Sequence, residues 1–484
     1  MTFTTLTFLA FLAVVFSLYW ATPSRRLQNA LLLAASYFFY GWWDARFCLL
    51  LLSSSVVDFL VGRGLTATTS EVKRRWILAV SVASNLGVLV AFKYFDFFVD
   101  NFRLVCEQLG WPVSVPALRW VLPVGLSFYT FQTMSYTFDV YSRKINATRS
   151  LLDYLAYVSF FPQLVAGPIE RATHLLPQFF ERRSFVYEKG VDGCRQILWG
   201  FFKKLLIADR LGAFVDEVYG SLGTADGPRV VFATLAFAFQ IYCDFSAYSD
   251  IAIGTAKLFG FDLNRNFAYP YFSQSVTEFW RRWHMSLAKW LRDYVYIPLG
   301  GNRMGRWRTA FNILAVFGLS GLWHGASWNF VVWGLLMGGV VVIEAILQAS
   351  QTSDPVPGGS SRFPTVVSTL KMAFVFSVVG MGWIFFRAES LGEAVHALET
   401  IVASWNPNVW NEYVTVVVSD SGIQKVIWLV TLLLLFEWFQ RRHPYPLYFP
   451  QLHRWQRWAI YALLLWSILF IGPVTNRSFI YFTF

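Results

Sequence analysis

The chain has 484 residues, of which 56% are hydrophobic, 19% aromatic and 14% charged, and its formal net charge is +11. This balance lies far from that of soluble globular proteins and indicates a polytopic membrane protein. The surplus of Lys and Arg fits cytoplasmic loops drawn to anionic lipid, and we expect no nucleic-acid partner because no soluble basic module is present. The four cysteines have no close pairing or metal-ligand spacing, so we expect no metal site.

Apolar runs that can cross a membrane follow one another along the chain. A helix needs about 17–25 residues to span the hydrocarbon layer. The candidate runs lie at residues 3–22, 27–43, 47–62, 76–96, 118–138, 193–215, 229–259, 307–349, 365–386, 423–439 and 457–473. We predict an all-α membrane bundle with roughly 10–12 spans, because the two longest runs can each hold more than one.

The first apolar run predicts the orientation of the chain. It has no basic residue before it, and Arg25 and Arg26 follow it, so we expect an uncleaved anchor with its amino terminus outside the cytoplasm. The low-complexity stretch SQTSDPVPGGSSRFP (350–364) is predicted to form a mobile loop. Because apolar runs lie on both sides of it, we treat residues 1–484 as a single integral membrane domain.

The segment TEFWRRWHMSLAKWLRDYVYIPLGG (277–301) is unusually charged for this chain. Wound as one helix over 278–296, it has two faces. The apolar face carries Trp280, Trp283, Leu287, Trp290, Leu291 and Tyr294, with His284 at its edge, and the basic face carries Arg281, Arg282, Lys289 and Arg292. Guanidinium groups at mid-depth are costly, so we expect a helix oblique to the membrane, either at the interface or lining a cavity. Lipid headgroups and a phosphate-bearing ligand both remain open as partners of the basic face.

The segment LSGLWHGASWNFVVWG (319–334) places His324 in the middle of an apolar run. An ionisable side chain in such a run is a functional candidate. Gly321 and Gly325 remove side-chain bulk, so a neighbouring backbone or a substrate can approach closely. A structural role, with the imidazole bonded to a nearby serine such as Ser320, remains the alternative. No acidic residue lies near enough in sequence to suggest a nucleophilic triad.

Four polar residues interrupt the apolar run 229–259. They are Asp244, Ser246, Tyr248 and Asp250. Carboxylates inside a membrane either line a cavity or pair with a cation, here the basic face of 278–296, and we leave both possibilities open. The remaining histidines lie in polar or loop-like contexts and are predicted to be surface residues, namely His174, His396, His443 and His453.

Six motifs in this order resemble the membrane-bound O-acyltransferase family, in the branch of bacterial alginate O-acetyltransferases and teichoic acid D-alanyl transferases. They are FPQLVAGPIER (161–171), QIYCDFSAYSDIAIG (240–254), TEFWRRWHMSLAKWLRDYVYIPLGGNR (277–303), LSGLWHGASWNFVVWG (319–334), MGWIFFRAES (381–390) and FIYFTF (479–484). The resemblance implies a helical bundle with a central funnel, entered by an acyl thioester from the cytoplasm and by an acceptor from the other face. It maps the buried family histidine onto His324 and a second family position onto His284.

The resemblance also implies a reaction: transfer of acetyl from acetyl-CoA to a hydroxyl, for O-acetylation of an exopolysaccharide at the bacterial inner membrane. A periplasmic partner that resembles an SGNH hydrolase is expected to pass the group to the glycan, and no permanently bound cofactor is expected. His324 is predicted to be the general base, whereas His284 or a backbone N–H stabilises the oxyanion. The residues expected to bind the phosphates of coenzyme A are Arg281, Arg282, Lys289, Arg292 and Arg303, and those expected to line the cavity are Asp244, Ser246, Tyr248, Asp250, Trp323 and Ser320.

Two alternatives remain at this point. Within the same class, the chain transfers D-alanyl or another acyl group to teichoic acid, lipid or protein. In a different class, it transports an acyl carrier or a glycan, because transporters also combine many spans with buried charges. No inverted repeat in the sequence supports the transporter.

Overall fold

The computed structural model describes residues 1–111, 113–349, 364–419, 421–441, 443, 445–472 and 477–482. Throughout these ranges the regular structure is helical and contains no strand, which confirms the all-α prediction. The loop predicted at 350–364 lies outside the described residues except for Pro364, and so do the last two residues of FIYFTF.

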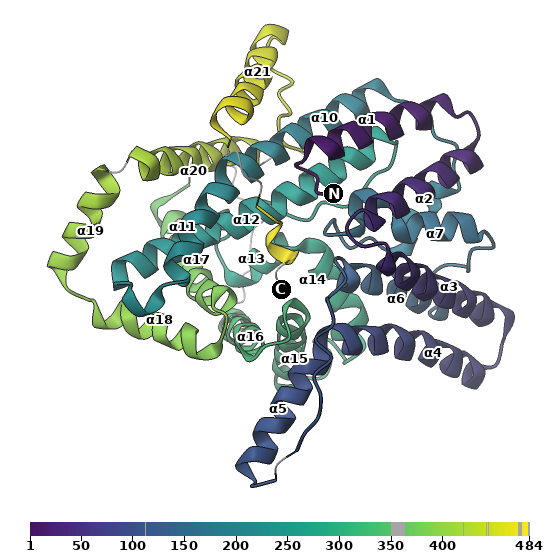
Figure 1. Cartoon of the computed structure of the whole chain (residues 1–484), viewed down its shortest axis with the longest axis horizontal. Coiled ribbons are helices and arrows are strands. Elements are labelled where there is room, and N and C mark those ends of the chain that lie inside the picture. The colour runs from purple at the N-terminus through teal and green to yellow at the C-terminus, as the bar shows by residue number, and fades with distance from the viewer. Residues whose placement is uncertain are drawn as a thin grey trace. The chain divides into compact units, whose positions relative to one another are not determined.

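The helices form two compact units. The first unit comprises residues 1–197 and 248–264, and the second comprises residues 198–247 and 265–484. Two helices, α10 (Tyr187–Phe201) and α12 (Gly227–Leu258), each begin in one unit and end in the other. Both helices are labelled in Figure 1.

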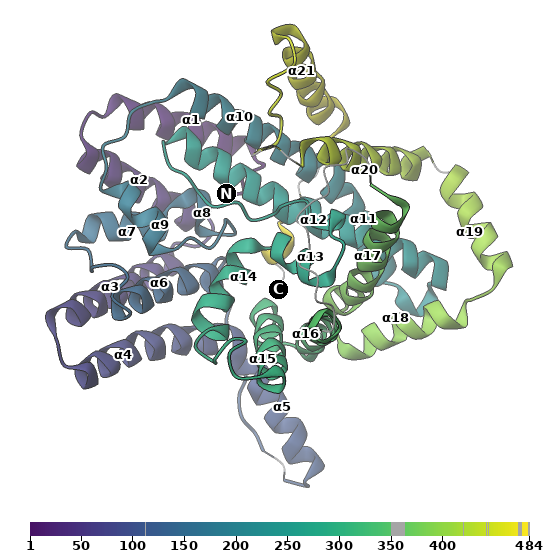
Figure 2. The same cartoon turned by 180° about the vertical axis from the view of Figure 1, so that it is seen from behind.

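The first unit is built mainly from long helices. They are α1 (Leu6–Ala21), α2 (Arg25–Gly41), α3 (Arg46–Ala67), α4 (Glu71–Leu89), α5 (Phe95–Gln108), α6 (Leu126–Tyr141) and α7 (Leu151–Ser159), with the short α8 (Phe161–Leu164) and α9 (Ala172–Leu175). Helices α3, α4 and α6 lie side by side (Figure 2). Between them the buried carboxylate of Asp58 accepts hydrogen bonds from Ser81 Oγ at 2.5 Å and Asn85 Nδ2 at 2.8 Å. These bonds meet the need of a buried polar group for partners and join α3 to α4.

The second unit holds the later helices. They are α11 (Asp209–Tyr219), α13 (Val276–Arg282), α14 (Met285–Leu291), α15 (Arg306–His324), α16 (Trp328–Ala349), α17 (Val366–Arg387), α18 (Leu391–Ala403), α19 (Pro407–Ser419), α20 (Ser421–Gln440) and α21 (Arg454–Ile471). Helices α15 and α16 pack closely. A β-carbon on Gly321 would overlap the carbonyl group of Phe330, so glycine is needed for this approach.

Six helices of the described chain are long and apolar enough to cross a membrane. They are Arg46–Ala67, Glu71–Gln108, Gly227–Leu258, Trp328–Leu347, Val366–Arg387 and Ile423–Gln440. The protein is therefore a multi-pass membrane protein. The six are fewer than the apolar runs of the sequence. One reason is that the run 118–138 is not a single helix: its first part is irregular as far as Gly125, whose φ of 77° is left-handed, and α6 begins only at Leu126.

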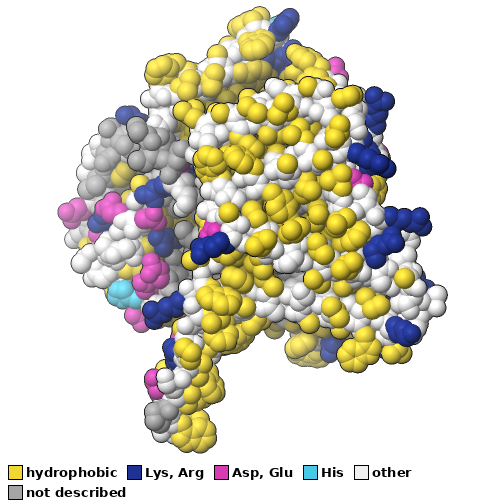
Figure 3. All heavy atoms as spheres, turned by 45° about the vertical axis from the view of Figure 1, so that its right-hand side comes forward, with side chains coloured by type: hydrophobic (Ala, Val, Ile, Leu, Met, Phe, Trp, Pro, Cys, Tyr) yellow, Lys and Arg dark blue, Asp and Glu magenta, His cyan; other side chains and the backbone are white. Residues whose placement is uncertain are grey.

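The surface of the protein agrees with this assignment. Figure 3 shows many hydrophobic side chains exposed over the central part of this face, and several Lys and Arg side chains along its right-hand edge. Apolar surface on this scale is expected where lipid is the solvent.

Candidate active site

The charged segment 278–296 is not one helix, contrary to the prediction. Helix α13 ends at Arg282, and His284 adopts left-handed backbone angles, with φ 42° and ψ 53°, before α14 begins. The interruption is stabilised from outside the segment. Ala268 N donates to Arg282 O and Met285 N donates to Asn266 O, each at 2.9 Å, in place of helical hydrogen bonds. A non-glycine residue in this conformation is strained, and such strain is concentrated at functional sites.

The apolar and basic faces predicted for the segment are both present in the structure, although the helix is interrupted. Trp283, Leu287, Trp290 and Leu291 are buried, whereas Arg281, Lys289 and Arg292 are exposed. After α14 the chain continues as a π-helical turn over Arg292–Tyr296.

His284 is enclosed by protein on several sides. Its side chain is 2% exposed, and Nδ1 lies 3.1 Å from Asn266 Oδ1. Its ring lies edge-on to Phe245, at 4.7 Å between ring centres, and to Trp323, at 5.8 Å. Burial lowers the pKa of His284 to about 3, so its imidazole is neutral at physiological pH.

His324 is the last residue of α15 and lies beside His284. The two ring centres are 6.4 Å apart, although the residues are 40 positions apart in the sequence. The His324 side chain is 5% exposed and packs against Trp333 and Phe386, with ring centres at 5.3 and 5.2 Å. The helix ends here because Gly325 is extended, with φ −158°.

Both histidines line one cavity of about 500 Å³, called here the histidine cavity. Three basic side chains, those of Arg281, Lys289 and Arg292, line it as well, and no acidic residue of the described chain does. Within the described residues neither Arg281 nor Lys289 forms an ion pair, whereas Arg292 pairs with Asp293 at 2.7 Å. The cavity therefore combines two imidazoles with a positive wall, which suits an anionic ligand.

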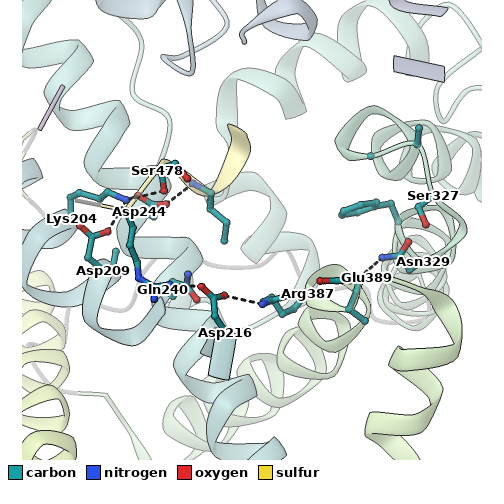
Figure 4. A pocket seen from close by; sticks show the side chains of 17 residues that line it. Lys204, Asp209, Asp216, Gln240, Asp244, Ser327, Asn329, Arg387, Glu389 and Ser478 are labelled. Atoms are coloured by element: carbon teal, nitrogen blue, oxygen red, sulfur yellow. Dashed lines mark hydrogen bonds and ion pairs between the residues drawn. The ribbon is translucent and has the colours of Figure 1, made fainter. Parts of the chain in front are cut away.

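A second cavity has a volume of about 610 Å³ and is called here the polar cavity. Gly325, the residue that follows His324, belongs to its lining. Figure 4 shows its charged side chains, with Lys204, Asp209 and Asp244 together in one group. Lys204 Nζ pairs with Asp209 at 2.8 Å and with Asp244 at 2.7 Å. Burial raises the pKa of Asp209 to about 6, and Lys204 opposes this only in part.

A second ion-pair group lies on the wall of the polar cavity. Arg387 pairs with Asp216 at 2.8 Å, and Arg477 bonds the other oxygen of the same carboxylate. Including Glu389, the lining has four carboxylates against three basic groups, so it is slightly acidic in formal charge. The two cavities on either side of the His324–Gly325 bond thus differ in the sign of their charge.

Comparison with known proteins decides the family. The model of MBOAT, the membrane-bound O-acyltransferase family, matches residues 118–380. The chain belongs to this family. It is 40% identical to the probable alginate O-acetylases AlgI of Azotobacter vinelandii and Pseudomonas aeruginosa, over 79% and 81% of this chain and 74% and 72% of theirs. It is 33% identical to the peptidoglycan O-acetyltransferase of Helicobacter pylori, over 77% of this chain and 73% of that protein.

Membership of the membrane-bound O-acyltransferase family makes the protein an O-acyltransferase and removes the reason for considering a transporter. Teichoic acid D-alanyltransferases also match, over less than half of the chain. The relatives therefore include both acetyl and D-alanyl transferases.

The acyltransferase brings some of the predicted site residues together. Ser320 lines the histidine cavity and Asp244 lines the polar cavity, where its partner is Lys204 and not the basic face of 278–296. Trp323 is buried with its ring centre 4.9 Å from that of His324. Ser246 is buried and accepts a hydrogen bond from Lys203 Nζ at 2.6 Å. Neither Trp323 nor Ser246 belongs to the lining of these two cavities.

Other predicted residues lie elsewhere in the acyltransferase. Tyr248 and Asp250 belong to the first unit, where Tyr248 stacks on Phe3 and Asp250 accepts a hydrogen bond from Gln196. Arg282 pairs with Glu278 at 2.5 Å and does not line the histidine cavity. Arg303 is exposed on the turn before α15 and is outside that lining too. Of the other histidines, His174, His396 and His453 are exposed, as predicted, whereas His443 is half-buried.

Several residues of the site were missed from the sequence. Lys203 and Lys204 could have been identified from the sequence, because two lysines inside the apolar run 193–215 need polar or acidic partners. Asn266 and Asp216 gave no such signal, since each lies in an ordinary polar context and gains its role only through tertiary contacts.

Proposed function

We propose that this acyltransferase moves an acetyl group from acetyl-CoA to a hydroxyl acceptor, with the chemistry in the histidine cavity. The observation that carries the proposal is one cavity lined by two buried histidines and by three basic side chains, whose described lining contains no acidic residue. Imidazole suits proton transfer near neutral pH, and basic side chains suit the phosphates of coenzyme A.

The reaction needs a base. The acceptor oxygen attacks the thioester carbonyl carbon and loses its proton, the carbon–sulfur bond of the tetrahedral intermediate breaks, and the proton returns to the departing sulfur. We assign the base to His324, which ends α15 at the junction of the two cavities. General base catalysis contributes about 10²–10⁴-fold, so positioning and oxyanion stabilisation must supply the rest.

The donor site is proposed at Arg281, Lys289 and Arg292. Arg281 and Lys289 carry charges that no described acidic residue neutralises, so they are available to phosphate. Arg282 and Arg303 contribute less under this proposal, because Arg282 is held by Glu278 and neither side chain reaches the cavity lining.

The acceptor hydroxyl is proposed to enter through the polar cavity. Its lining offers carboxylates, carboxamides and guanidinium groups that can hold a hydroxyl-bearing ligand by hydrogen bonds. A slightly acidic lining disfavours a glycan rich in carboxylates, because like charges repel. We therefore propose that the acetyl group passes first to a neutral hydroxyl of a periplasmic partner, of the SGNH-hydrolase-like type, and then to a cell-surface polysaccharide.

The names of the relatives support acetyl as the acyl group, because the matches that cover most of the chain are O-acetylases. D-alanyl transfer is the second candidate. Radiolabelled acetyl-CoA, and radiolabelled D-alanine with ATP and cytosol, should be supplied separately to membranes that contain the protein. Alkali-labile label on macromolecules from acetyl-CoA alone supports the proposal, whereas label from D-alanine alone contradicts it.

The role of His324 is tested in the same assay. His324→Ala should lower ester formation by about 10² or more. His396→Ala, an exposed histidine on α18, is the matched control and should keep wild-type activity. Near wild-type activity of His324→Ala at equal expression would give His324 a structural role and defeat the proposed mechanism.

A further inference from the structure

Asn266 is a buried residue that holds the left-handed turn at His284. It is fully buried, and its side-chain oxygen Oδ1 accepts a hydrogen bond from Ser286 Oγ at 2.9 Å and from Ser286 N at 3.3 Å. The same oxygen lies 3.1 Å from His284 Nδ1. Its backbone carbonyl accepts from Met285 N. One asparagine therefore bonds three consecutive residues across the break between α13 and α14.

These contacts fix which nitrogen of His284 carries the proton. A backbone N–H can only donate, so the Asn266 atom that faces Ser286 N must be the carbonyl oxygen and not the amide nitrogen. An oxygen cannot donate a hydrogen bond, so His284 Nδ1 must donate to it. In a neutral imidazole with its hydrogen on Nδ1, the other nitrogen, Nε2, carries a lone pair and can only accept.

We propose that Asn266 is a positioning residue that holds His284 in the Nδ1–H tautomer, so that His284 presents a hydrogen-bond acceptor to the reaction. This inference rests on the proposed function, in which the histidine cavity holds the reacting groups. It assigns His284 a role in proton handling. Asn266 acts on the reaction only through His284.

The inference also excludes His284 as the source of oxyanion stabilisation. The oxyanion of the tetrahedral intermediate needs a donor, and the neutral His284 of this structure has no hydrogen on Nε2 to offer. The donor must therefore come from another group, either a backbone N–H or a donor side chain of the cavity lining such as Ser320 or Arg281. His284 Nε2 instead suits the side of the reaction where a proton is lost, either as a second acceptor for the hydroxyl proton or as a partner of protonated His324.

The tautomer can be measured directly on the wild-type protein. The chain has only six histidines, so selective ¹⁵N-histidine labelling gives few signals, and His284→Gln identifies the one that belongs to His284. At neutral pH we expect that signal to show a protonated Nδ1 and an unprotonated Nε2. The reverse pattern overturns the proposal whatever the enzyme's activity.

Substitution of Asn266 tests the consequence. Asn266→Ala removes the acceptor at 3.1 Å from Nδ1 and leaves Ser286 Oγ, at 3.4 Å, as a weaker partner. We expect kcat to fall by about 10- to 100-fold, the effect of removing a group that orients a metal-bound histidine. The KM for acetyl-CoA should change little, because Asn266 does not line the histidine cavity. Asn312→Ala is the matched control, since Asn312 is also a fully buried asparagine outside the cavity lining, and its side chain donates to the backbone carbonyls of Leu299 and Gly301 and not to His284.

Asn266→Asp separates positioning from mere support of the fold. A carboxylate still accepts from His284 Nδ1 and from Ser286, but its charge favours imidazolium and raises the pKa of His284 by about one to three units. The basic groups that line the cavity, Arg281, Lys289 and Arg292, oppose this rise, and His324 is the other group there that titrates near neutral pH.

The ratio of kcat for Asn266→Asp to kcat for wild type should therefore fall as pH is lowered from 7 toward 5. A pH-independent ratio contradicts the proposal. The ¹⁵N pattern and the His324→Ala assay are separate measurements, so a failed tautomer assignment and a failed enzymatic proposal can be told apart.

Discussion

The carboxylate of Glu344 on α16 accepts hydrogen bonds from both the backbone N–H and the hydroxyl of Thr277 on α13, at 2.8 and 2.7 Å. It also accepts from Val276 N at 2.6 Å. These bonds satisfy the first N–H groups of α13, which have no partner within the helix. They hold in place the short helix that carries Arg281 to the histidine cavity.

Glu344→Ala should therefore weaken both stability and donor binding. Loss of hydrogen bonds to a charged group costs about 1.5–3 kcal/mol, which should appear as a lower Tm in detergent. The KM for acetyl-CoA should rise because Arg281 loses its fixed position. Glu344→Gln keeps one oxygen acceptor and should lie between Ala and wild type. An unchanged Tm and KM for Glu344→Ala would show that the hydrogen bonds of Glu344 to α13 contribute neither to stability nor to donor binding.

The packing of α15 on α16 gives a second prediction with a built-in control. Gly321→Ala would push a methyl group against the backbone of Phe330, and overpacking of this kind costs about 1–3 kcal/mol. Gly339→Ala on α16 faces open space and should be neutral or gain up to about 1 kcal/mol from better helix propensity. Thermal unfolding in detergent should give a lower Tm for Gly321→Ala than for Gly339→Ala, and equal Tm values for the two variants would contradict the close approach.

The sequence predicted those parts of the site that rest on local signals. His324 was identified because an imidazole in an apolar run is unusual, and the separation of basic from apolar side chains in 278–296 was identified from periodicity. Both statements depend on residues close together in the chain. The family resemblance added His284, which periodicity alone left at the edge of an apolar face.

The parts that the sequence did not predict depend on distant partners. No glycine or proline in the sequence marks the break at Trp283 and His284. The hydrogen bonds that stabilise this break come from residues 266–268, which are distant in the sequence. The partner of Asp244 is Lys204 from the π-helical turn Phe202–Ala208. Helical periodicity describes one element at a time, so it gives no information on which elements meet.

Asp209 predicts a pH dependence of stability. Its pKa is raised by burial to about 6 from an ordinary 3.8, so between these pH values the folded protein holds a proton that the unfolded chain has lost. The stability that this proton contributes is fully present below pH 3.8, the ordinary pKa, and is lost as pH rises through about 6, the pKa in the folded protein. At about 1.4 kcal/mol per unit the loss is at most about 3 kcal/mol.

Asp209→Asn removes this titration. The Tm of Asp209→Asn relative to wild type should therefore become more favourable as pH is raised from about 4 to 7. Thermal unfolding in one detergent at several pH values is the measurement. A constant difference in Tm across that range would mean that Asp209 keeps an ordinary pKa in the folded protein.

The donor site gives the prediction that separates phosphate binding from lipid anchoring. Arg281 and Lys289 line the histidine cavity without an acidic partner among the described residues, whereas neighbouring Arg282 is paired with Glu278 and lies outside the lining. If the cavity binds the phosphates of coenzyme A, Arg281→Gln should lose about 1.5–3 kcal/mol of donor affinity, which is about 10- to 100-fold in KM. Lys289→Gln should act in the same direction.

Arg282→Gln is the matched control, because it removes the same charge one residue away without reaching the cavity. If these side chains only attract anionic headgroups, each is worth about 1 kcal/mol at a membrane surface and should matter little in detergent. Titration of acetyl-CoA in detergent should therefore raise KM for Arg281→Gln and leave it nearly unchanged for Arg282→Gln, with the KM for the acceptor unaffected in both. Equal KM values for the two variants would place the donor phosphates elsewhere, because only Arg281 of this pair lines the histidine cavity.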